Sequence, residues 1–431
     1  MESRRSLANI AFVNRSAAVV TMLAIITVLS ITMPQDAQAQ TFSVLHYFTG
    51  GLDGDNPYAG VTLGRSGVLY GTAANGGTYG AGTVFKLSQV NSSWVFDPLY
   101  EFTGGSDGSF PLGGVVIGPN GALYGTTFGR VGGNFGTVFE LTSPPTFCRG
   151  ITCFWNATIL HTFTGPDGSS PQTENLIFDS SGDIYGTTGA GGLYNSGTMF
   201  ELTPSGGGYT ESILHSFGNG SDGRNPLPGI LFDTAGNAYG TTERGGTGSP
   251  SECHGSCGAV FQLTPSNGGW VENVLVNYDN TNGENPYGNL IIDASGNLYG
   301  TTTGGGQNGG GVVYKLAPSS GGFTYSVLYA FSSCGSRAGL AEDAAGNFFG
   351  VCYVGGAQDD GWIFELANCS QQCNLIDLHD FSGSDGMRPY GSPGLDASGN
   401  LYGTTAAGGT GCPGGCGVVW ELAGVGAPRK N

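Results

Sequence analysis

Positively charged residues are scarce in this 431-residue chain, which has 14 lysines and arginines against 32 acidic residues and a formal net charge of −18. Nucleic acids and anionic membranes are bound largely through clustered basic side chains. The sequence contains no such basic cluster, so neither partner is expected. An acidic surface also keeps extracellular proteins soluble, and by itself it indicates no ligand.

Helical patterning is also missing. After residue 39 no window of 11 or more residues has apolar residues at helical spacing, and 81 glycines oppose helix formation. The sequence lacks a Ser/His/Asp set, a His-Glu-x-x-His zinc motif and a phosphate loop. We therefore expect an all-β protein without cofactor or metal site. Calcium stays open, although the aspartate-containing turns lack the glutamate that a calcium loop requires.

The first 39 residues have the pattern of a secretory signal peptide. A basic start precedes the apolar run from Ala17 to Met33, and Ala37-Gln38-Ala39 provides a small-x-small cleavage site. The alternative is an uncleaved anchor helix, but a run of about 17 residues is at the short limit for spanning a bilayer. No second apolar segment follows and the C-terminus carries no anchor, so we expect a secreted or periplasmic protein.

What the chain has in abundance is a repeat built on Leu-Tyr-Gly-Thr-Thr, which reads in full, for example, at residues 298–302 and 401–405. Seven copies at a near-constant spacing indicate one closed repeat architecture and not several separate domains. The tyrosine of the motif, or its substitute, lies at Tyr70, Tyr124, Tyr185, Tyr239, Tyr299, Phe349 and Tyr402.

Each repeat holds four apolar runs separated by glycine-rich turns. In the third copy these runs are residues 176–179, 184–188, 198–202 and 211–217. Four short strands at hairpin spacing predict an antiparallel sheet, and seven such sheets bury both faces when they pack around an axis. We predict a seven-bladed β-propeller over residues 40–423, followed by a short tail at 424–431. A linear solenoid is the alternative, but it needs polar caps that the sequence lacks.

The two ends of the repeat region are complementary. Residues 42–48 match the fourth strand of a repeat, whereas the last repeat stops after its third strand, at residues 418–422. Pairing of these two segments would close the ring and hide an unpaired strand edge. We therefore predict that the N-terminal strand completes the last blade.

All ten cysteines follow residue 39, and an even number in an exported chain indicates disulfides. Zinc held by two cysteine pairs is the alternative, but pairs in different repeats would have to converge. The sixth repeat departs from the pattern and places two cysteines at one end of its blade, so we predict a Cys334–Cys352 disulfide. The other eight cysteines form close pairs: Cys148/Cys153, Cys253/Cys257, Cys369/Cys373 and Cys412/Cys416.

The predicted blade-to-blade loops carry an Asp-Gly-x-x-Pro motif, and they share a face with the glycine-rich loops between the second and third strands. We interpret the aspartates mainly as turn caps, with the proline fixing entry into the next strand. The alternative is an acidic ring that binds cations or sugar hydroxyls. The candidate ligand-binding residues are these aspartates and four off-pattern charges: Asp53, Asp107, Asp167, Asp222, Asp385, Glu243, Arg244, Asp359 and Asp360.

Four of the five histidines occupy one repeat position, where other copies have Tyr100 or Tyr329. An exchange of histidine for tyrosine favours a packing or rim position over a general base. These histidines are His46, His161, His215 and His379.

The repeat unit resembles the bacterial Gloeo/Verruco (GloVer) tandem repeat. The resemblance rests on Gly-x-Leu-Tyr-Gly-Thr-Thr, Gly-Thr-Val-Phe-Glu-Leu-Thr-Pro, Val-Leu-His-x-Phe and Asp-Gly-x-x-Pro, which recur in that order over residues 42–423. It implies an exported bacterial protein; the C-terminal sorting anchor of some members is absent. Residues 293–299 are also similar to NHL-type propeller repeats, which implies that Leu-Ile-Ile-Asp forms the innermost strand.

Taken together, these features favour an exported, non-enzymatic binding or interaction module. A glycan or an envelope protein is the expected partner, and a monomer is the expected state. The alternative from another class is a lyase or hydrolase with its site at the mouth of the central channel. That alternative requires polar or charged residues of one or two blades to converge on a common point.

Overall fold

The computed structural model describes residues 40–129, 135–144, 154–172, 174–220, 222–247, 257–267, 269–369 and 373–426. The chain divides into two units, residues 1–40 and 41–431. Only Gln40 of the first unit is described, so the predicted signal peptide lies outside the described residues. Within the described ranges, no helix has the length and apolar character needed to cross a bilayer.

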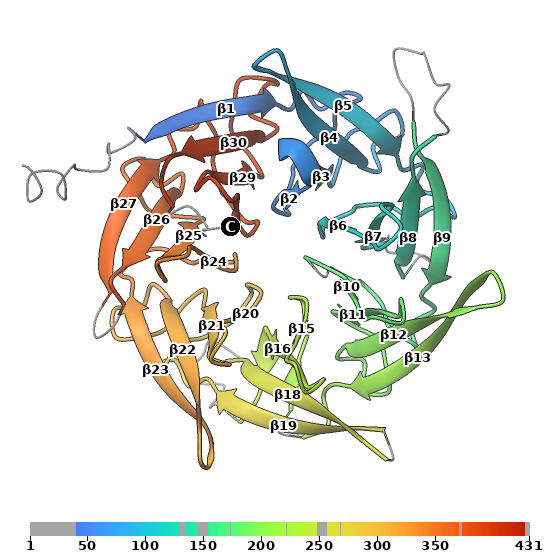
Figure 1. Ribbon diagram of the computed structural model, residues 1–431, viewed down its shortest axis with the longest axis vertical. Coiled ribbons are helices and arrows are strands. Elements are labelled where there is room, and N and C mark those ends of the chain that lie inside the picture. The colour runs from blue at the N-terminus through green and yellow to red at the C-terminus, as the bar shows by residue number, and fades with distance from the viewer. Residues whose placement is uncertain are drawn as a thin grey trace, which may run out of the picture. The chain divides into compact units, whose positions relative to one another are not determined.

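The second unit is a ring of seven four-stranded antiparallel sheets, as the sequence predicts (Figure 1). The innermost strand of each blade is only two or three residues long, and one short 3₁₀ turn, η1 (Arg65–Gly67), occurs in the first blade. Blades 1 to 3 contain β2 (Thr62–Leu63), β3 (Leu69–Ala73), β4 (Thr83–Val90) and β5 (Ser93–Glu101); β6 (Val115–Ile117), β7 (Leu123–Thr127), β8 (Thr137–Thr142) and β9 (Asn156–Thr162); and β10 (Ile177–Phe178), β11 (Ile184–Thr188), β12 (Thr198–Ser205) and β13 (Gly208–Ser216).

The remaining blades repeat this order, and a small two-stranded sheet of β14 (Gly223–Arg224) and β17 (Arg244–Gly245) joins two loops of blade 4. Blades 4 to 7 contain β15 (Leu231–Phe232), β16 (Ala238–Thr242), β18 (Ala259–Ser266) and β19 (Gly269–Asn277); β20 (Ile291–Ile292), β21 (Leu298–Thr301), β22 (Val312–Ser319) and β23 (Gly322–Ala330); β24 (Ala341–Glu342), β25 (Phe348–Cys352), β26 (Trp362–Ala367) and β27 (Asn374–Asp380); and β28 (Gly394–Leu395), β29 (Leu401–Thr405), β30 (Val418–Ala423) and β1 (Thr41–Tyr47).

Ring closure follows the prediction. β1 pairs antiparallel with β30, from Thr41 opposite Ala423 to Tyr47 opposite Val418, and the sheet order is β1-β30-β29-β28. Figure 1 shows β1 on the outside of this blade, in the place that β5 or β9 takes in the others. One N-terminal strand therefore joins three C-terminal strands, and β30 has no free edge.

The glycine of Leu-Tyr-Gly-Thr-Thr lies beneath an aromatic ring of the neighbouring strand. A Cβ atom at Gly403 would lie 2.3 Å from the ring of Trp420, which pairs with it across the sheet. Such a distance is too short for any side chain, so this position requires glycine. The same arrangement occurs in the other six blades, as Gly71/Phe85, Gly125/Phe139, Gly186/Phe200, Gly240/Phe261, Gly300/Tyr314 and Gly350/Phe364.

The third and fourth strands are longer than predicted. In blade 3 the predicted turn at residues 203–208 is strand except for Gly206 and Gly207, which both have positive φ. A two-residue turn of this kind suits a tight hairpin. Pro204 is tolerated because β11 ends before it, so no donor is needed on that side.

Threonine hydroxyls connect adjacent blades near the axis. The first threonine after the motif glycine donates to a backbone carbonyl at the entry of the next blade, as in Thr404 Oγ1 to Ala59 O at 2.7 Å and Thr187 Oγ1 to Pro228 O at 3.0 Å. Blade 6 has Val351 at this position and lacks the hydroxyl. The entry segments that surround the axis are therefore tied to their neighbours in most blades.

The structure joins Cys334 to Cys352, the pair that the sequence predicts in blade 6. It also joins Cys369 to Cys373 and Cys412 to Cys416, and Cys257 is disulfide-bonded. The residues Cys148, Cys153 and Cys253 lie outside the described part of the chain.

Candidate functional site

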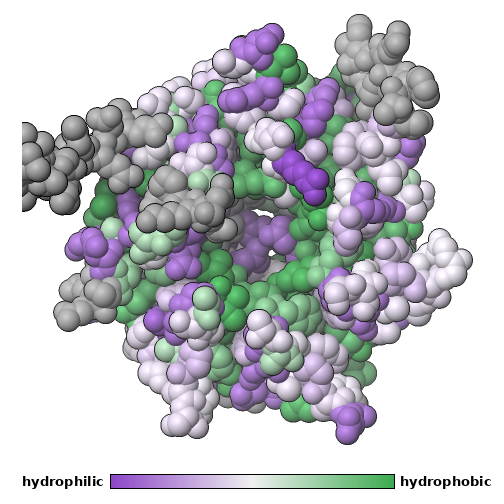
Figure 2. Space-filling view, viewed as in Figure 1, coloured by the Kyte–Doolittle hydropathy of each residue, from purple (hydrophilic) through white to green (hydrophobic). Residues whose placement is uncertain are grey.

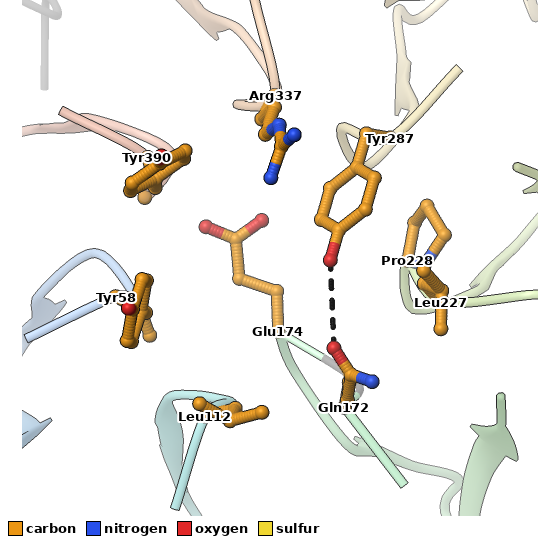
Figure 3. Close-up of a pocket in the computed structure, with 11 residues that line it drawn as sticks. Tyr58, Leu112, Gln172, Glu174, Leu227, Pro228, Tyr287, Arg337 and Tyr390 are labelled. Carbon is orange, nitrogen blue, oxygen red and sulfur yellow. Dashed lines mark hydrogen bonds between the residues drawn. The ribbon is translucent and has the colours of Figure 1, made fainter. Parts of the chain in front are cut away.

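A cavity of about 260 Å³ lies at the axis, where the blade-to-blade loops lead into the innermost strands (Figure 3). Its wall combines aromatic rings, aliphatic side chains and two charged groups. The lining residues are Tyr58, Ala59, Leu112, Gln172, Glu174, Leu227, Pro228, Tyr287, Arg337, Tyr390 and Gly391.

Most of this wall comes from one repeat position, the residue after the motif proline. Different blades place different side chains there, although the surrounding fold repeats. The position holds Tyr58, Leu112, Gln172, Leu227, Tyr287 and Tyr390, and Arg337 takes the equivalent place in the sixth loop, which lacks the proline. The seven-fold repeat is thus broken at the point where all blades meet.

Arg337 lies among tyrosine rings. Its guanidinium carbon is 5.3 Å from the ring centroid of Tyr287, 5.0 Å from that of Tyr353 and 5.2 Å from that of Tyr390. Cation–π contacts of this kind hold a cation while leaving its hydrogen-bond donors available. Its Nε atom is buried without a hydrogen-bond partner.

The tyrosines of the pocket also contact one another and the neighbouring Tyr353. The ring centroids of Tyr353 and Tyr390 are 5.4 Å apart in a stacked arrangement, and those of Tyr58 and Tyr390 are 5.5 Å apart. Gly335 makes room for this group, because a Cβ atom there would lie 2.5 Å from Tyr353. On the opposite side, Tyr287 donates its hydroxyl to Gln172 Oε1 at 3.4 Å.

Glu174 reaches across the axis from blade 3. The segment from Pro171 to Leu176 is one residue longer than the equivalent segment from Pro57 to Val61, and Glu174 belongs to this longer segment. Its carboxyl accepts hydrogen bonds from Ser392 N at 2.5 Å, Ser392 Oγ at 2.6 Å and Asn289 Nδ2 at 2.8 Å. Residues of blades 3, 5 and 7 are thereby joined at the centre.

The same glutamate separates two spaces. A second cavity of about 550 Å³ is lined by the innermost strands, and Glu174 borders both this cavity and the pocket. Figure 2 shows the ring hollowed at its axis, with hydrophilic residues inside the opening. The pocket therefore forms a chamber with a polar floor at the level of Glu174.

Burial alters the acidity of several groups in the pocket. It raises the pKa of Glu174 above its usual value, although the hydrogen bonds from Ser392 and Gly60 oppose this effect. Burial also raises the pKa of Tyr287, and the charge of Arg337 opposes that rise. Tyr287 is therefore a neutral hydrogen-bonding group at physiological pH and not a base.

The predicted aspartates do not line this pocket. Each accepts hydrogen bonds within its own loop, as in Thr49 N to Asp53 Oδ2 at 2.9 Å and Thr103 N to Asp107 Oδ2 at 2.8 Å. Asp53 also bonds to His46 Nε2 at 3.0 Å, and Asp167, Asp222 and Asp385 bond in the same way to His161, His215 and His379. This geometry agrees with turn capping; a ligand at the aspartates stays a prediction.

The four off-pattern charges also lie outside the pocket lining. Arg244 Nε is 3.5 Å from Glu243 Oε1, and the arginine side chain is largely exposed. Asp359 Oδ1 accepts a hydrogen bond from Gly355 N at 2.8 Å, within its own loop. The backbone carbonyl of Asp360 accepts from Arg388 N. The structure thus does not bring these residues together into one site.

His215, Asp222 and Glu272 form the cluster of described residues that could surround a metal ion, with one ligand atom from each within 4.8 Å of the others. The histidine–aspartate part of the cluster recurs elsewhere. At His46 and His379 a phenylalanine ring stacks on the histidine in place of the glutamate. The pair therefore has a structural role in the repeat, and the absence of a metal site stays a prediction.

Glu272 and Glu211 occupy equivalent positions on β19 and β13, against the histidine–aspartate pair of the preceding blade. Burial raises the pKa of each to about 7, and the neighbouring Asp222 or Asp167 adds to the rise; His215 opposes it at Glu272. The folded state therefore binds these protons more tightly than the unfolded state, in which the pKa is near 4.5. Their contribution to stability is full below pH 4.5 and is lost as the pH rises through 7.

Glu272→Gln should remove this pH dependence. We expect the variant to be more stable than the parent protein by about 1–2 kcal/mol at pH 8, after allowance for the exposed part of the side chain, and nearly equal to it at pH 5. Denaturant titrations at both pH values measure the difference. Glu101→Gln, which changes a carboxylate bonded to the amide of Thr78 near the surface, is the control. An equal gain at both pH values would contradict the argument.

Sequence reasoning missed the pocket residues. The sixth repeat departs from the common pattern, but no sequence motif marks Arg337 as a site residue. A comparison of the residue after each motif proline, with the sixth loop aligned to the others, would have exposed the exchange among tyrosine, leucine, glutamine and arginine. The extra residue before Leu176 was a second available signal.

The architecture defines a seven-bladed β-propeller. The profile of the Gloeobacter/Verrucomicrobia repeat family matches residues 27–154 and 151–339, and the chain belongs to this family, which confirms the resemblance found in the repeat unit. No match was found among curated proteins.

Several solved structures match this chain at low sequence identity. A protein assigned as a gluconolactonase is 12% identical, with 89% of this chain and 92% of that chain covered and a TM-score of 0.43. A protein assigned as a 6-phosphogluconolactonase from Bacteroides uniformis is 15% identical, with 78% and 88% covered and a TM-score of 0.48. A protein assigned as an oxidoreductase (glucose dehydrogenase) from Thermus thermophilus is 13% identical, with 89% and 100% covered and a TM-score of 0.42. These values carry no information about activity.

Proposed function

We propose that the protein is an exported bacterial binding protein that holds part of a saccharide in the pocket at the axis. The supporting observation is the loss of seven-fold symmetry at the residue after each motif proline. A purely structural ring has no need for different side chains at equivalent places. A binding site does, because a ligand on the axis contacts every blade.

The chemistry of the wall suits a sugar. Tyr58, Tyr287 and Tyr390 offer flat apolar faces together with hydroxyl groups, and Gln172 adds an amide. A sugar ring likewise combines apolar C–H faces with hydroxyls. The volume of about 260 Å³ is just below the usual range for drug-sized ligands, so the pocket holds one end of a longer chain or a single ring.

An enzyme at the same place is the second candidate, because two charged groups from different blades converge there. Both oxygens of Glu174 accept hydrogen bonds from Ser392 or Asn289, and the wall offers no other carboxyl among its described residues. A general base must be free to take a proton from the substrate. This arrangement supports binding over catalysis.

The test is a glycan screen with residues 40–431, followed by calorimetry. We expect Tyr58→Ala and Tyr390→Ala each to weaken saccharide binding at least tenfold without a large change in thermal stability. Tyr79→Ala is the matched control, since Tyr79 is 62% exposed and lies outside the pocket lining. Turnover of a saccharide, or equal binding by all three variants, would overturn the proposal.

A further inference from the structure

Arg337 supplies a positively charged group to the wall of the pocket. None of the ion pairs between described residues includes this arginine. Its ring contacts with Tyr287, Tyr353 and Tyr390 hold the guanidinium. A contact with a ring face does not give any of the five N–H donors a hydrogen-bond acceptor. A half-buried, unpaired arginine is costly unless something else supplies the acceptor.

The carboxyl of Glu174 already has hydrogen-bond partners within the protein. Its carboxyl accepts three hydrogen bonds from Ser392 and Asn289, so its oxygens are directed at the opposite blades. Figure 3 shows both Glu174 and Arg337 directed toward the centre of the pocket. The hydrogen bonds that Glu174 accepts reduce the repulsion between its carboxyl and a second anion. Arg337 is then the charged group of the pocket that needs a partner.

The position of the arginine matters as much as its charge. In the other loops the equivalent residue is tyrosine, leucine or glutamine, so Arg337 is specific to one blade. Its loop is fixed by the Cys334–Cys352 disulfide three residues earlier. Guanidinium groups bind carboxylates through two parallel N–H donors, and Figure 3 shows the guanidinium of Arg337 directed into the pocket.

We infer that the ligand carries a carboxylate which pairs with Arg337, and that the pocket is selective for acidic sugars such as uronic acids. The inference rests on the proposed function in taking the pocket as the ligand site, and it adds the chemical class. The sugar ring contacts the rings of Tyr58 and Tyr390, and its carboxylate lies against the guanidinium. A neutral sugar would leave the arginine without an acceptor.

Trigalacturonic acid and its methyl ester differ in charge and not in the arrangement of the ring hydroxyls. Calorimetry should show at least tenfold tighter binding of the acid, and weaker binding of the acid in high salt. Arg337→Gln should reduce the preference to less than threefold while retaining binding of the ester. Arg337→Lys should restore part of the preference for the acid, because lysine keeps the positive charge but loses the paired donors. Thermal stability of each variant is measured alongside.

The outcomes separate the two proposals. Equal binding of acid and ester, or a preference that survives in Arg337→Gln, would overturn the acidic-ligand inference and leave saccharide binding standing. Phenylacetate serves as a carboxylate without a sugar. If it binds in an Arg337-dependent manner while neither saccharide binds, the carboxylate site stands and the saccharide function falls. If none of the three binds, both fall. If Arg337→Gln fails to fold, the comparison of acid and ester binding by the parent protein still tests the acidic-ligand inference.

Discussion

Deleting Thr41–Tyr47 is expected to open the propeller. The deletion exposes the edge of β30 and removes Phe42, Val44 and Leu45 from the clusters that they cover in and beside blade 7. Burial of these side chains contributes roughly 5–10 kcal/mol before the cost of ordering the strand, so we expect a net loss of about 3–6 kcal/mol. Denaturant titration measures the loss, and gel filtration should show aggregation through the free edge.

A circular permutant provides the matched control. Thr41 lies opposite Ala423, so a two-residue Asn-Gly turn can join them and make β1 the C-terminal strand of the chain. The permutant should regain most of the lost stability, because it restores the strand and changes only the connection. A deletion variant as stable as the parent protein would show that ring closure does not hold the fold together.

Removing the Cys334–Cys352 disulfide has the second-largest expected effect. The bond closes a loop of 18 residues, and the double substitution Cys334→Ser/Cys352→Ser should lower the free energy of unfolding by about 3 kcal/mol. The sixth loop lacks the aspartate and proline that fix its counterparts, so the crosslink replaces them. Because Arg337 follows in the same loop, acidic-ligand binding should weaken as well. Chemical denaturation and calorimetry measure the two effects.

The Cys369–Cys373 bond is the internal comparison. It closes a loop of only four residues and therefore restricts the unfolded chain less. Cys369→Ser/Cys373→Ser should cost clearly less stability than the first pair and leave ligand binding unchanged. Equal losses from the two pairs would contradict the role assigned to the sixth loop.

Repetition explains why the fold could be predicted in detail. Seven copies of one pattern average out local ambiguity, and a spare strand at 42–48 together with a missing strand after 422 determined the closure. The third and fourth strands are longer than the apolar runs predict, because they continue through polar residues and through Pro204. It is accommodated where β12 extends beyond its inner neighbour β11.

The pocket was harder to predict because its residues are the ones that do not repeat. The conspicuous aspartates of the motif, such as Asp53 and Asp107, turned out to bond within their own loops. Glu174 and Arg337 come from loops 163 residues apart in the sequence, and only the closed ring brings them to one axis. No local sequence pattern shows that these two residues lie close together. A repeat copy that does not align with the others does point to the site.

The pairing of β1 with β30 has a consequence for biogenesis. β1 is the first strand of the ring to leave the ribosome. It cannot pair until β30, the last strand, has also left, since Ala423 is the partner of Thr41. Blade 7 therefore cannot assemble before Ala423 is available to pair with Thr41. A chain that crosses a membrane in extended form would become a ring only after β30 had arrived on the far side.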